Sequence, residues 1–377
     1  MRYLKLYNNY DFTIERAEGV YIYDTDGNKY FDTFAGIGVL ALGHSHPKVV
    51  KEISKKLERY AHTSNYFLDE DTERVAELIT SQGEKVFFVN SGTEATELAL
   101  KVIKKKIDGG KILFFSNSFH GRSLGALSVN GFPGIRDQFK PLLPDTIEAE
   151  FNNVESLKKT AADNPDIKAV FFEPLQGSGG VQPATQEFIA ELKSQIAANN
   201  WILAVDEVQA GLYRTAKQYS YQHFDLKPDL VTVAKALGGG LPLGGVIMVG
   251  EMTEVLKPGD HGSTFAPNPL ALRGAKVVLE ELEEMQASIA ERGEYFLNRL
   301  KELDSEKIED VRGIGLMLGI ELKEVIPNLR DRAQAEGVLL NLVKGRIIRF
   351  LPALNITKNE IDELIEKLEK ITKSMNS

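Results

Sequence analysis

The sequence contains no cysteine among its 377 residues. Disulfides, thiolate nucleophiles and cysteine-ligated metal sites are therefore excluded, and the composition is typical of a protein of the reducing cytoplasm. Long uncharged apolar runs are also missing, because the nearest candidate, residues 236–250, is too short for a membrane helix and is rich in glycine. The amino terminus lacks the apolar stretch of a secretory signal. We therefore expect a cytoplasmic protein with no membrane partner.

The chain also lacks an excess of positive charge. The chain has 45 Lys and Arg against 54 Asp and Glu, which gives a formal net charge of −9. This balance disfavours a nucleic-acid partner, because binding to phosphate backbones requires clustered cations. The one basic run, residues 101–106, fits the solvated end of a helix. A small-molecule partner is the better expectation.

Short apolar runs alternate with amphipathic stretches between residues 84 and 250. The runs are KVFFVN, KILFFS, AVFFEP, WILAVDEV, DLVTVAK and GGVIMVG. Runs rich in Val, Ile and Phe and bounded in this way are typical of strands that are buried on both faces of a mostly parallel sheet. The sequence therefore predicts an α/β fold with helices covering the sheet.

Both ends of the chain show a different pattern. GVYIYD and KYFDTF flank an Asp-Gly-Asn turn, which predicts a hairpin, and helical patterns begin at Pro47. The pattern after Asn268 is helical to about residue 303, and short strands follow. Thr357 and Glu360 have capping-box spacing at the start of a last helix. We predict a large domain over residues 46–267 and a smaller α+β domain built together from residues 1–45 and 268–377.

Three features lie where a predicted strand ends, which is the edge at which open α/β sheets bind ligands. The first is Ser91-Gly92-Thr93-Glu94, where the free N–H groups and the dipole of a helix start favour an anion. The same spacing is also a plain capping box, so a phosphate site and a helix cap both stay open. No Walker loop and no Gly-x-Gly-x-x-Gly after a strand is present, which disfavours a nicotinamide enzyme.

The second and third features are charged residues that follow buried strands. Asp206 needs a partner when desolvated, either a protonated pyridine nitrogen or a helix cap or structural arginine. Alternation along the strand directs Val208 to the same face as Asp206. Lys235 ends an apolar run and precedes three glycines. A semi-buried amine has a lowered pKa and attacks carbonyl carbons, although a lysine that extends to solvent is the common alternative.

Six ordered blocks, SGTEA, FHGR, EPLQG, DEVQ, AKALGGGLPLGG and HGSTF followed by NPL, resemble the class III aminotransferases of fold type I. The resemblance is strongest to the acetylornithine aminotransferase branch and runs from residue 43 to residue 352. It implies a fold type I α/β enzyme that binds pyridoxal 5′-phosphate (PLP). It also implies transfer of an amino group, from the δ-position of N2-acetylornithine, to 2-oxoglutarate, which gives glutamate and a semialdehyde.

The resemblance also implies roles for individual residues. Lys235 resembles the lysine that binds the cofactor covalently and moves the proton, and Asp206 resembles the carboxylate that keeps the pyridine nitrogen protonated. The other residues implied at the cofactor are Ser91, Gly92, Thr93, Phe119, His120, Val208, Gln209 and Thr264. Thr264 resembles a residue that reaches the phosphate of the neighbouring subunit, which implies a homodimer with shared active sites. The residues implied at the substrate are Arg122, Ser263 and Arg349.

Three positions depart from the family pattern. Ser178 stands where ornithine and 4-aminobutyrate relatives commonly have a glutamate that pairs with the C-terminal arginine. Without that carboxylate, Arg349 should stay exposed to substrate carboxylates. Leu40 and Leu68 stand where acetylornithine relatives usually have an asparagine and an aromatic residue, so we expect a more apolar substrate pocket. Apart from the resemblance, Arg349 is equally well read as a surface cation on an edge strand.

Other functions stay open. Ornithine, succinylornithine and 4-aminobutyrate are alternative donors, and a fold type I decarboxylase, racemase or aminomutase also uses the roles implied for Lys235 and Asp206. A non-catalytic PLP-binding regulator is disfavoured because we find no basic patch for DNA. His44 and His46 are expected to form a turn before the helix at Pro47, so we expect no metal site.

Overall fold

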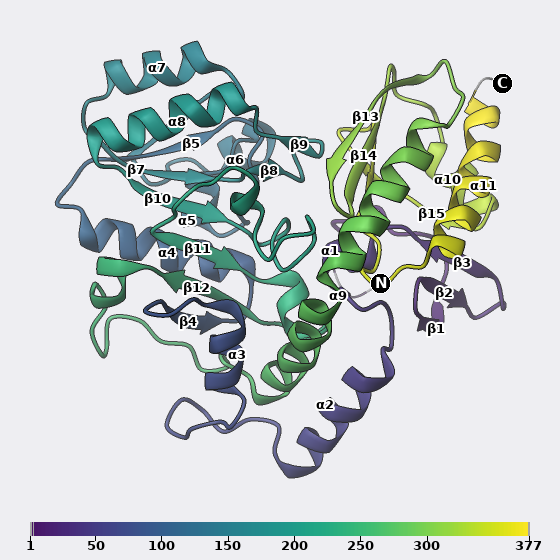
Figure 1. Cartoon of the computed structure of the whole chain (residues 1–377), viewed down its shortest axis with the longest axis horizontal. Helices are drawn as coiled ribbons and strands as arrows, with labels where there is room; N and C mark the ends of the chain where they lie inside the picture. The colour runs from purple at the N-terminus through teal and green to yellow at the C-terminus, as the bar shows by residue number, and fades with distance from the viewer. Residues whose placement is uncertain (1, 3, 376–377) are drawn as a thin grey trace.

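The computed structural model describes residue 2 and residues 4–375. Its largest sheet has seven strands (Figure 1), in the order β4 (Lys85–Val89), β12 (Gly244–Met248), β11 (Leu230–Val233), β10 (Ile202–Asp206), β7 (Ile167–Phe172), β5 (Lys111–Phe115) and β6 (Thr146–Ala149). β12 is antiparallel to β11 and β4, and the other neighbours run parallel. The six predicted runs are thus confirmed as strands of a mostly parallel sheet.

Alternation along the strands divides the core into two layers. Ile112 and Phe114 of β5 pack with α4 (Gly92–Lys106) on one face of the sheet. Leu113 and Phe115 point the other way and pack with α7 (Val154–Asp163) and α8 (Gln186–Asn199). Figure 1 shows α7 and α8 stacked along one side of the sheet. Both faces are therefore covered, as the continuous apolar runs predict.

The two chain ends share a four-stranded sheet. It has the order β1 (Ile14–Glu18), β2 (Tyr21–Asp24), β3 (Lys29–Asp32) and β15 (Val338–Leu339), and the β3–β15 pair joins the ends. The predicted hairpin is confirmed as β2 and β3. This pairing supports a small domain built from both ends, whose boundaries stay a prediction.

A second four-stranded sheet lies in the C-terminal part. Its order is β13 (Ile308–Ile314), β14 (Met317–Leu322), β17 (Ile347–Phe350) and β16 (Asn341–Val343). Helices α10 (Leu329–Ala335) and α11 (Lys358–Met375) complete this region. The predicted capping box is confirmed, because Glu360 N–H donates to Thr357 Oγ1 and Thr357 N–H donates to Glu360 Oε2.

A 33-residue helix, α9 (Pro269–Lys301), connects the two regions and runs between them in Figure 1. It begins where the sequence predicts, since the Asn268 side chain accepts hydrogen bonds from Leu270 N–H and Ala271 N–H. It packs against α2 (Pro47–Arg59) at one end and against α11 farther along. In the described part of the chain, no helix combines the length and apolar character needed to cross a bilayer.

The remaining elements are short and lie mainly in the loops around the large sheet. They are α1 (Ala35–Gly38), α3 (Thr72–Ile79), α5 (Leu124–Ser128), α6 (Pro133–Arg136), β8 (Leu175–Gln176), β9 (Gln182–Pro183) and the 3₁₀ helices η1 (Asp137–Phe139), η2 (Ser220–His223), η3 (Lys235–Gly238) and η4 (Gly250–Glu254).

Candidate active site

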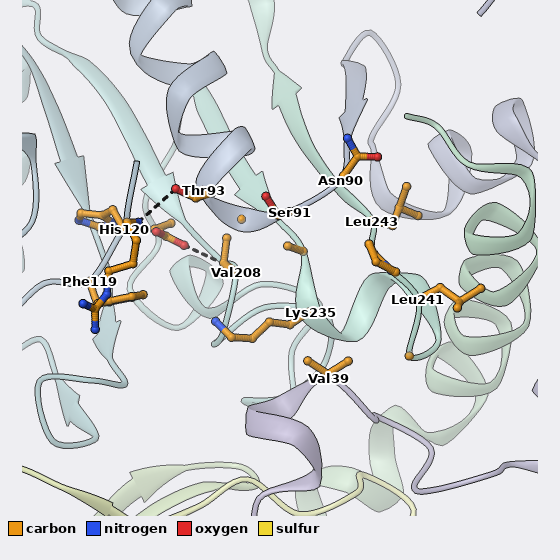
Figure 2. A pocket seen from close by; sticks show the side chains of 17 residues that line it. Val39, Asn90, Ser91, Thr93, Phe119, His120, Val208, Lys235, Leu241 and Leu243 are labelled. Carbon is orange, nitrogen blue, oxygen red and sulfur yellow. Dashed lines mark hydrogen bonds and ion pairs between the residues drawn. The ribbon is translucent and has the colours of Figure 1, made fainter. Parts of the chain in front are cut away.

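A cavity of about 470 Å³ lies at the carboxyl ends of β4, β5, β10 and β11. Four short segments that follow these strands line it, and Val39 and the loop before β12 close it. The lining residues are Val39, Asn90, Ser91, Gly92, Thr93, Phe119, His120, Gly121, Arg122, Asp206, Val208, Ala234, Lys235, Gly240, Leu241, Pro242 and Leu243. Figure 2 shows side chains from these segments gathered around one space. The sheet edge thus brings together residues far apart in the sequence.

Lys235 lies two residues beyond the end of β11, at the first position of η3. Its backbone has φ +45°, a left-handed conformation that costs energy for a residue with a side chain. The residue is only partly exposed and lines the cavity. Burial lowers the pKa of its amine to about 8; Asp206 opposes this shift and Arg349 adds to it. At neutral pH a useful fraction of the amine is therefore unprotonated and nucleophilic.

Asp206 ends β10 and is buried beside His120. Its Oδ2 lies 2.7 Å from His120 Nδ1, and its Oδ1 accepts a hydrogen bond from Val208 N–H at 2.9 Å. The His120 ring packs edge-on against Phe171 with 4.6 Å between ring centroids, which holds it in place. The partner of Asp206 is thus a histidine and not the structural arginine considered from the sequence.

The start of α4 combines a helix cap with a close approach to the segment that follows β10. Ser91 Oγ accepts a hydrogen bond from Glu94 N–H, and Glu94 Oε2 accepts one from Asn90 N–H. In a standard capping box the glutamate accepts a hydrogen bond from the N-cap residue itself. Here Glu94 accepts it from Asn90, the residue before the N-cap Ser91. A Cβ at Gly92 would lie 2.7 Å from Val208 Cγ1, so only glycine allows the helix start to come this near. The cap leaves the first N–H groups of the helix directed at the cavity.

A family model described as "Aminotransferase class-III" matches residues 4–372. The chain belongs to the class III aminotransferases. The aminotransferase is 40% identical over 378 residues to the acetylornithine aminotransferase of Aquifex aeolicus. The matched region covers 97% of this chain and 99% of that protein. The chain is 37% identical over 381 residues to the acetylornithine aminotransferase of Methanocaldococcus jannaschii, with 98% and 95% covered.

Solved structures of aminotransferases share the fold. The N-acetylornithine aminotransferase of Stenotrophomonas maltophilia matches with a TM-score of 0.82 at 31% identity and covers 97% of this chain and 96% of that chain. The ornithine aminotransferase of Toxoplasma gondii matches with a TM-score of 0.92 at 28% identity, with 100% and 93% covered. The protein is therefore a fold type I, PLP-dependent aminotransferase, as the sequence blocks predict.

The cavity of the aminotransferase suits PLP. The helix start at Gly92 offers N–H groups to a phosphate, and the buried carboxylate of Asp206 can pair with a protonated ring nitrogen. Lys235 places an amine with a lowered pKa in the same cavity. Among the described residues no group of three or more His, Asp or Glu is arranged to hold a metal ion, and His44 Nε2 instead lies 2.8 Å from Asp32 Oδ2.

The aminotransferase places Phe119 and Arg122 side by side at the mouth of the cavity. The Arg122 guanidinium lies 5.6 Å from the Phe119 ring centroid and is exposed. Phe119 N–H donates to Glu173 Oε2 at 2.9 Å, which fixes the loop backbone. Thr93 Oγ1 accepts a hydrogen bond from Arg122 N–H and thereby connects this loop to the start of α4.

Arg349 does not fit the alternative of a surface cation on an edge strand. It lies on β17, which β14 and β16 flank, so it is not on an edge strand. Its side chain is buried with 5% exposure, so the alternative of a surface cation is wrong, while its access to a substrate carboxylate stays a prediction. It donates to Gln209 Oε1 at 3.0 Å and to Asn341 Oδ1 at 2.9 Å. Neither Arg349 nor Gln209 lines the 470 Å³ cavity in the described part of the chain.

Ser263 and Thr264 belong to a segment outside this cavity. Ser263 Oγ accepts a hydrogen bond from Asn90 Nδ2 at 3.2 Å, so the segment borders the start of α4. Thr264 is exposed to solvent.

Leu40 and Leu68 are the two departures from the family pattern that were expected to make the substrate pocket more apolar. Leu68 is fully exposed. Leu40 lines a neighbouring cavity of about 310 Å³, which shares Gly240 and Leu241 with the first.

Glu173, a carboxylate buried beside the site, was not predicted from the sequence. Burial raises its pKa to about 7; His120 opposes the shift and Asp206 adds to it. Glu173 follows the apolar run of β7 just as Asp206 ends that of β10. The pattern that pointed to Asp206, a carboxylate at the end of an apolar run, therefore also pointed to Glu173. Asn90, which lines the cavity, was also missed.

Proposed function

We propose that this aminotransferase transfers the δ-amino group of N2-acetylornithine to 2-oxoglutarate and forms glutamate and the acetylated semialdehyde. The observation that carries the proposal is similarity at 35–40% identity, over nearly the whole chain, to proteins named acetylornithine aminotransferase. Ornithine, succinylornithine and 4-aminobutyrate are alternative donors. Ornithine has specific support, because several of the similar solved structures are ornithine aminotransferases.

In this proposal Lys235 binds the cofactor through Nζ and then moves a proton at the substrate carbon. Bound PLP supplies a ring that takes up the electron pair left when that carbon loses its proton. Asp206 holds a proton at the ring nitrogen, and His120 fixes the orientation of its carboxylate through the 2.7 Å contact. The proposed contacts to the phosphate and to the ring come from Ser91, Gly92, Thr93, Phe119, Val208 and Gln209.

Two arginines are proposed to bind substrate carboxylates. Arg122 is exposed at the cavity, and its planar guanidinium suits a carboxylate held through two parallel hydrogen bonds. Arg349 is buried and approaches the site from β17, near enough to influence the Lys235 amine. We assign 2-oxoglutarate to this pair because it carries a carboxylate at each end. Ser263 is proposed to contact the substrate from the segment beside Asn90.

We also propose that the enzyme is a homodimer in which Thr264 completes the phosphate site of the partner subunit. Phe265, next to Thr264, is 64% exposed, and Tyr66, Phe67 and Leu68 are at least 70% exposed. The two segments lie side by side, since Asn65 Nδ2 donates to Ser263 O and the His62 ring contacts the Phe265 ring. An exposed apolar surface of this kind is typical of a protein interface.

A donor panel tests the proposed reaction. The PLP-loaded enzyme is incubated with 2-oxoglutarate and each of the four donors, and glutamate formation is measured. We expect kcat/KM for N2-acetylornithine to exceed that for every other donor by about a hundredfold, because a pocket fitted to one polar group discriminates strongly. A higher value for another donor would reassign the substrate. Release of carbon dioxide without glutamate would indicate a decarboxylase instead.

A further inference from the structure

A polar cavity of about 320 Å³ lies where the C-terminal sheet meets the loops that follow β5, β6 and β7. Figure 1 shows β9 next to β13 at this boundary, and the two strands are in contact. In the described part of the chain the cavity shares no lining residue with that of the candidate active site. Small ligands often bind at boundaries of this kind. The cavity is therefore a separate candidate site.

Hydrogen-bond donors dominate the lining of this cavity. Four amide side chains line it together with three cations, Arg312, Lys344 and Arg346, and one carboxylate, Glu321. Cations and amides donate N–H groups, whereas an ionised carboxylate only accepts. A donor-rich cavity suits a ligand with acceptor oxygens, such as a carboxylate or a phosphate.

Glu321 is already engaged by two guanidinium groups. Its Oε2 accepts a hydrogen bond from Arg312 Nη1 at 2.5 Å, and its Oε1 is paired with Arg346 Nη2. Outside the cavity, Asp310 Oδ2 accepts a hydrogen bond from Arg312 Nη1 at 2.8 Å. Glu309 Oε2 accepts one from Arg346 Nη1, also at 2.8 Å. These ion pairs fix both arginines at the wall of the cavity.

Lys344 is the cation of this cavity with which no carboxylate pairs in the described part of the chain. Its Nζ donates instead to Asn117 Oδ1, a neutral acceptor, at 2.8 Å. Partial burial lowers the pKa of the amine; Glu321 opposes this shift, and Arg312 and Arg346 add to it. An ammonium group has more N–H groups than this one bond uses, so donors remain for a ligand. Lys344 is exposed, so a ligand can reach it.

Lys344 also occupies a backbone position that suits a different residue. Val343 O accepts a hydrogen bond from Arg346 N–H, so residues 344 and 345 are central in a tight turn between β16 and β17. Their φ angles are +50° and +73°, and turns with positive φ at both central positions favour Asn-Gly. A lysine at the first position therefore costs stability relative to asparagine. Backbone strain of this kind clusters at functional sites.

We propose that this cavity is an anion-binding site distinct from the active site, in which Lys344, beside Arg346, binds the carboxylate or phosphate group of a small organic anion. The ammonium group supplies charge and hydrogen bonds, and Asn117 holds the amine at the cavity. A bound anion connects the C-terminal sheet to the loop after β5, because Lys344 belongs to the first and Asn117 to the second.

Titration calorimetry on the PLP-loaded enzyme tests this site with two probes, citrate for carboxylates and pyrophosphate for phosphates. We expect wild type to bind at least one of them. Lys344→Asn should bind it at least ~10-fold more weakly, because a charge-assisted hydrogen bond is lost. The thermal midpoint of Lys344→Asn should equal or exceed that of wild type, since asparagine suits the turn. The probe that loses affinity identifies the group that the site prefers.

Three further variants are controls. Lys344→Arg keeps the charge in the same turn and should bind the probe within about threefold of wild type. Lys227→Asn makes the same chemical change at an exposed lysine before the amino end of β11 and should leave probe binding unchanged. Arg122→Gln alters the cavity of the candidate active site and should leave it unchanged as well.

Four outcomes overturn the proposal. The first is a wild-type enzyme that binds neither probe, and the second is equal affinity in wild type and Lys344→Asn. The third is a loss of affinity in Arg122→Gln in place of Lys344→Asn, which puts the anion in the active site. The fourth is a loss of affinity in Lys344→Arg as well, with a lower thermal midpoint in both variants, which assigns Lys344 to the turn alone.

Discussion

Lys235 carries an amine that loses its proton more readily than a lysine in water does. Burial penalises the charged form and lowers its pKa to about 8, against an ordinary value of 10.5. Because only the neutral amine attacks a carbonyl carbon, the rate of PLP uptake by the cofactor-free protein should rise by about tenfold for each pH unit below 8 and level off above it. Stopped-flow absorbance of the cofactor measures this rate.

The control for that pH profile is Nα-acetyl-lysine, a free lysine derivative whose side-chain amine can react with PLP. Its reaction with PLP should keep accelerating to about pH 10.5, since its amine has an ordinary pKa. A protein profile that follows the free amine would mean that the surroundings of Lys235 leave its amine unshifted. Substitution of Lys235 by alanine should abolish the uptake signal at every pH, because no other amine from β11 or η3 lines the cavity in the described part of the chain.

The start of α4 serves two purposes that a pair of variants can separate. Ser91→Ala removes the hydroxyl that caps α4, and Thr185→Ala removes the equivalent hydroxyl that caps α8 through Phe188 N–H. Each should lower the free energy of unfolding by about 1 kcal/mol, as loss of an N-cap does. Only Ser91→Ala should also weaken PLP binding, because α8 begins away from the cavity. Chemical denaturation and PLP titration measure the two effects. Equal PLP affinity in both variants would assign Ser91 to the helix cap alone.

Strands were predictable from the sequence where both of their faces are buried. Runs such as residues 202–205 are apolar throughout because a helix covers each side of the sheet. Thr146–Ala149, which forms β6, lies at the sheet edge and is half-buried, so its apolar signal is too weak to stand out. The strand Ile14–Glu18 was missed for the same reason, since most of its residues are exposed.

Residues of the candidate site were predictable where each stands at the end of a single apolar strand. Lys235, Asp206 and Gly92 each follow or end an apolar run, and the structure gathers them in one cavity. The surroundings of Arg349 were not predictable, because they depend on Gln209 and Asn341, which lie 140 and 8 residues away along the chain. Contacts of this kind depend on tertiary packing, which leaves no periodic trace in a single sequence.

At the scale of the whole molecule, the proposed dimer gives each active site residues from two chains. The segment with Thr264 is exposed and lies beside the apolar residues Tyr66, Phe67 and Leu68. If Thr264 serves the partner's cavity, a Thr264→Arg subunit damages the neighbouring site and leaves its own Lys235 intact. A Lys235→Ala subunit has the opposite defect, so the two variants should complement each other.

Co-expression of the two variants with different purification tags tests this expectation. Each variant alone should be nearly inactive, whereas a random mixture should recover about a quarter of wild-type activity, because half of the dimers are mixed and each mixed dimer has one intact site. Thr25→Arg, a change at another exposed threonine, is the control and should be fully active by itself. Isolated mixed dimers without activity, or a Thr264→Arg enzyme that is active alone, would contradict a shared site, since either result means that each chain builds its phosphate contacts unaided.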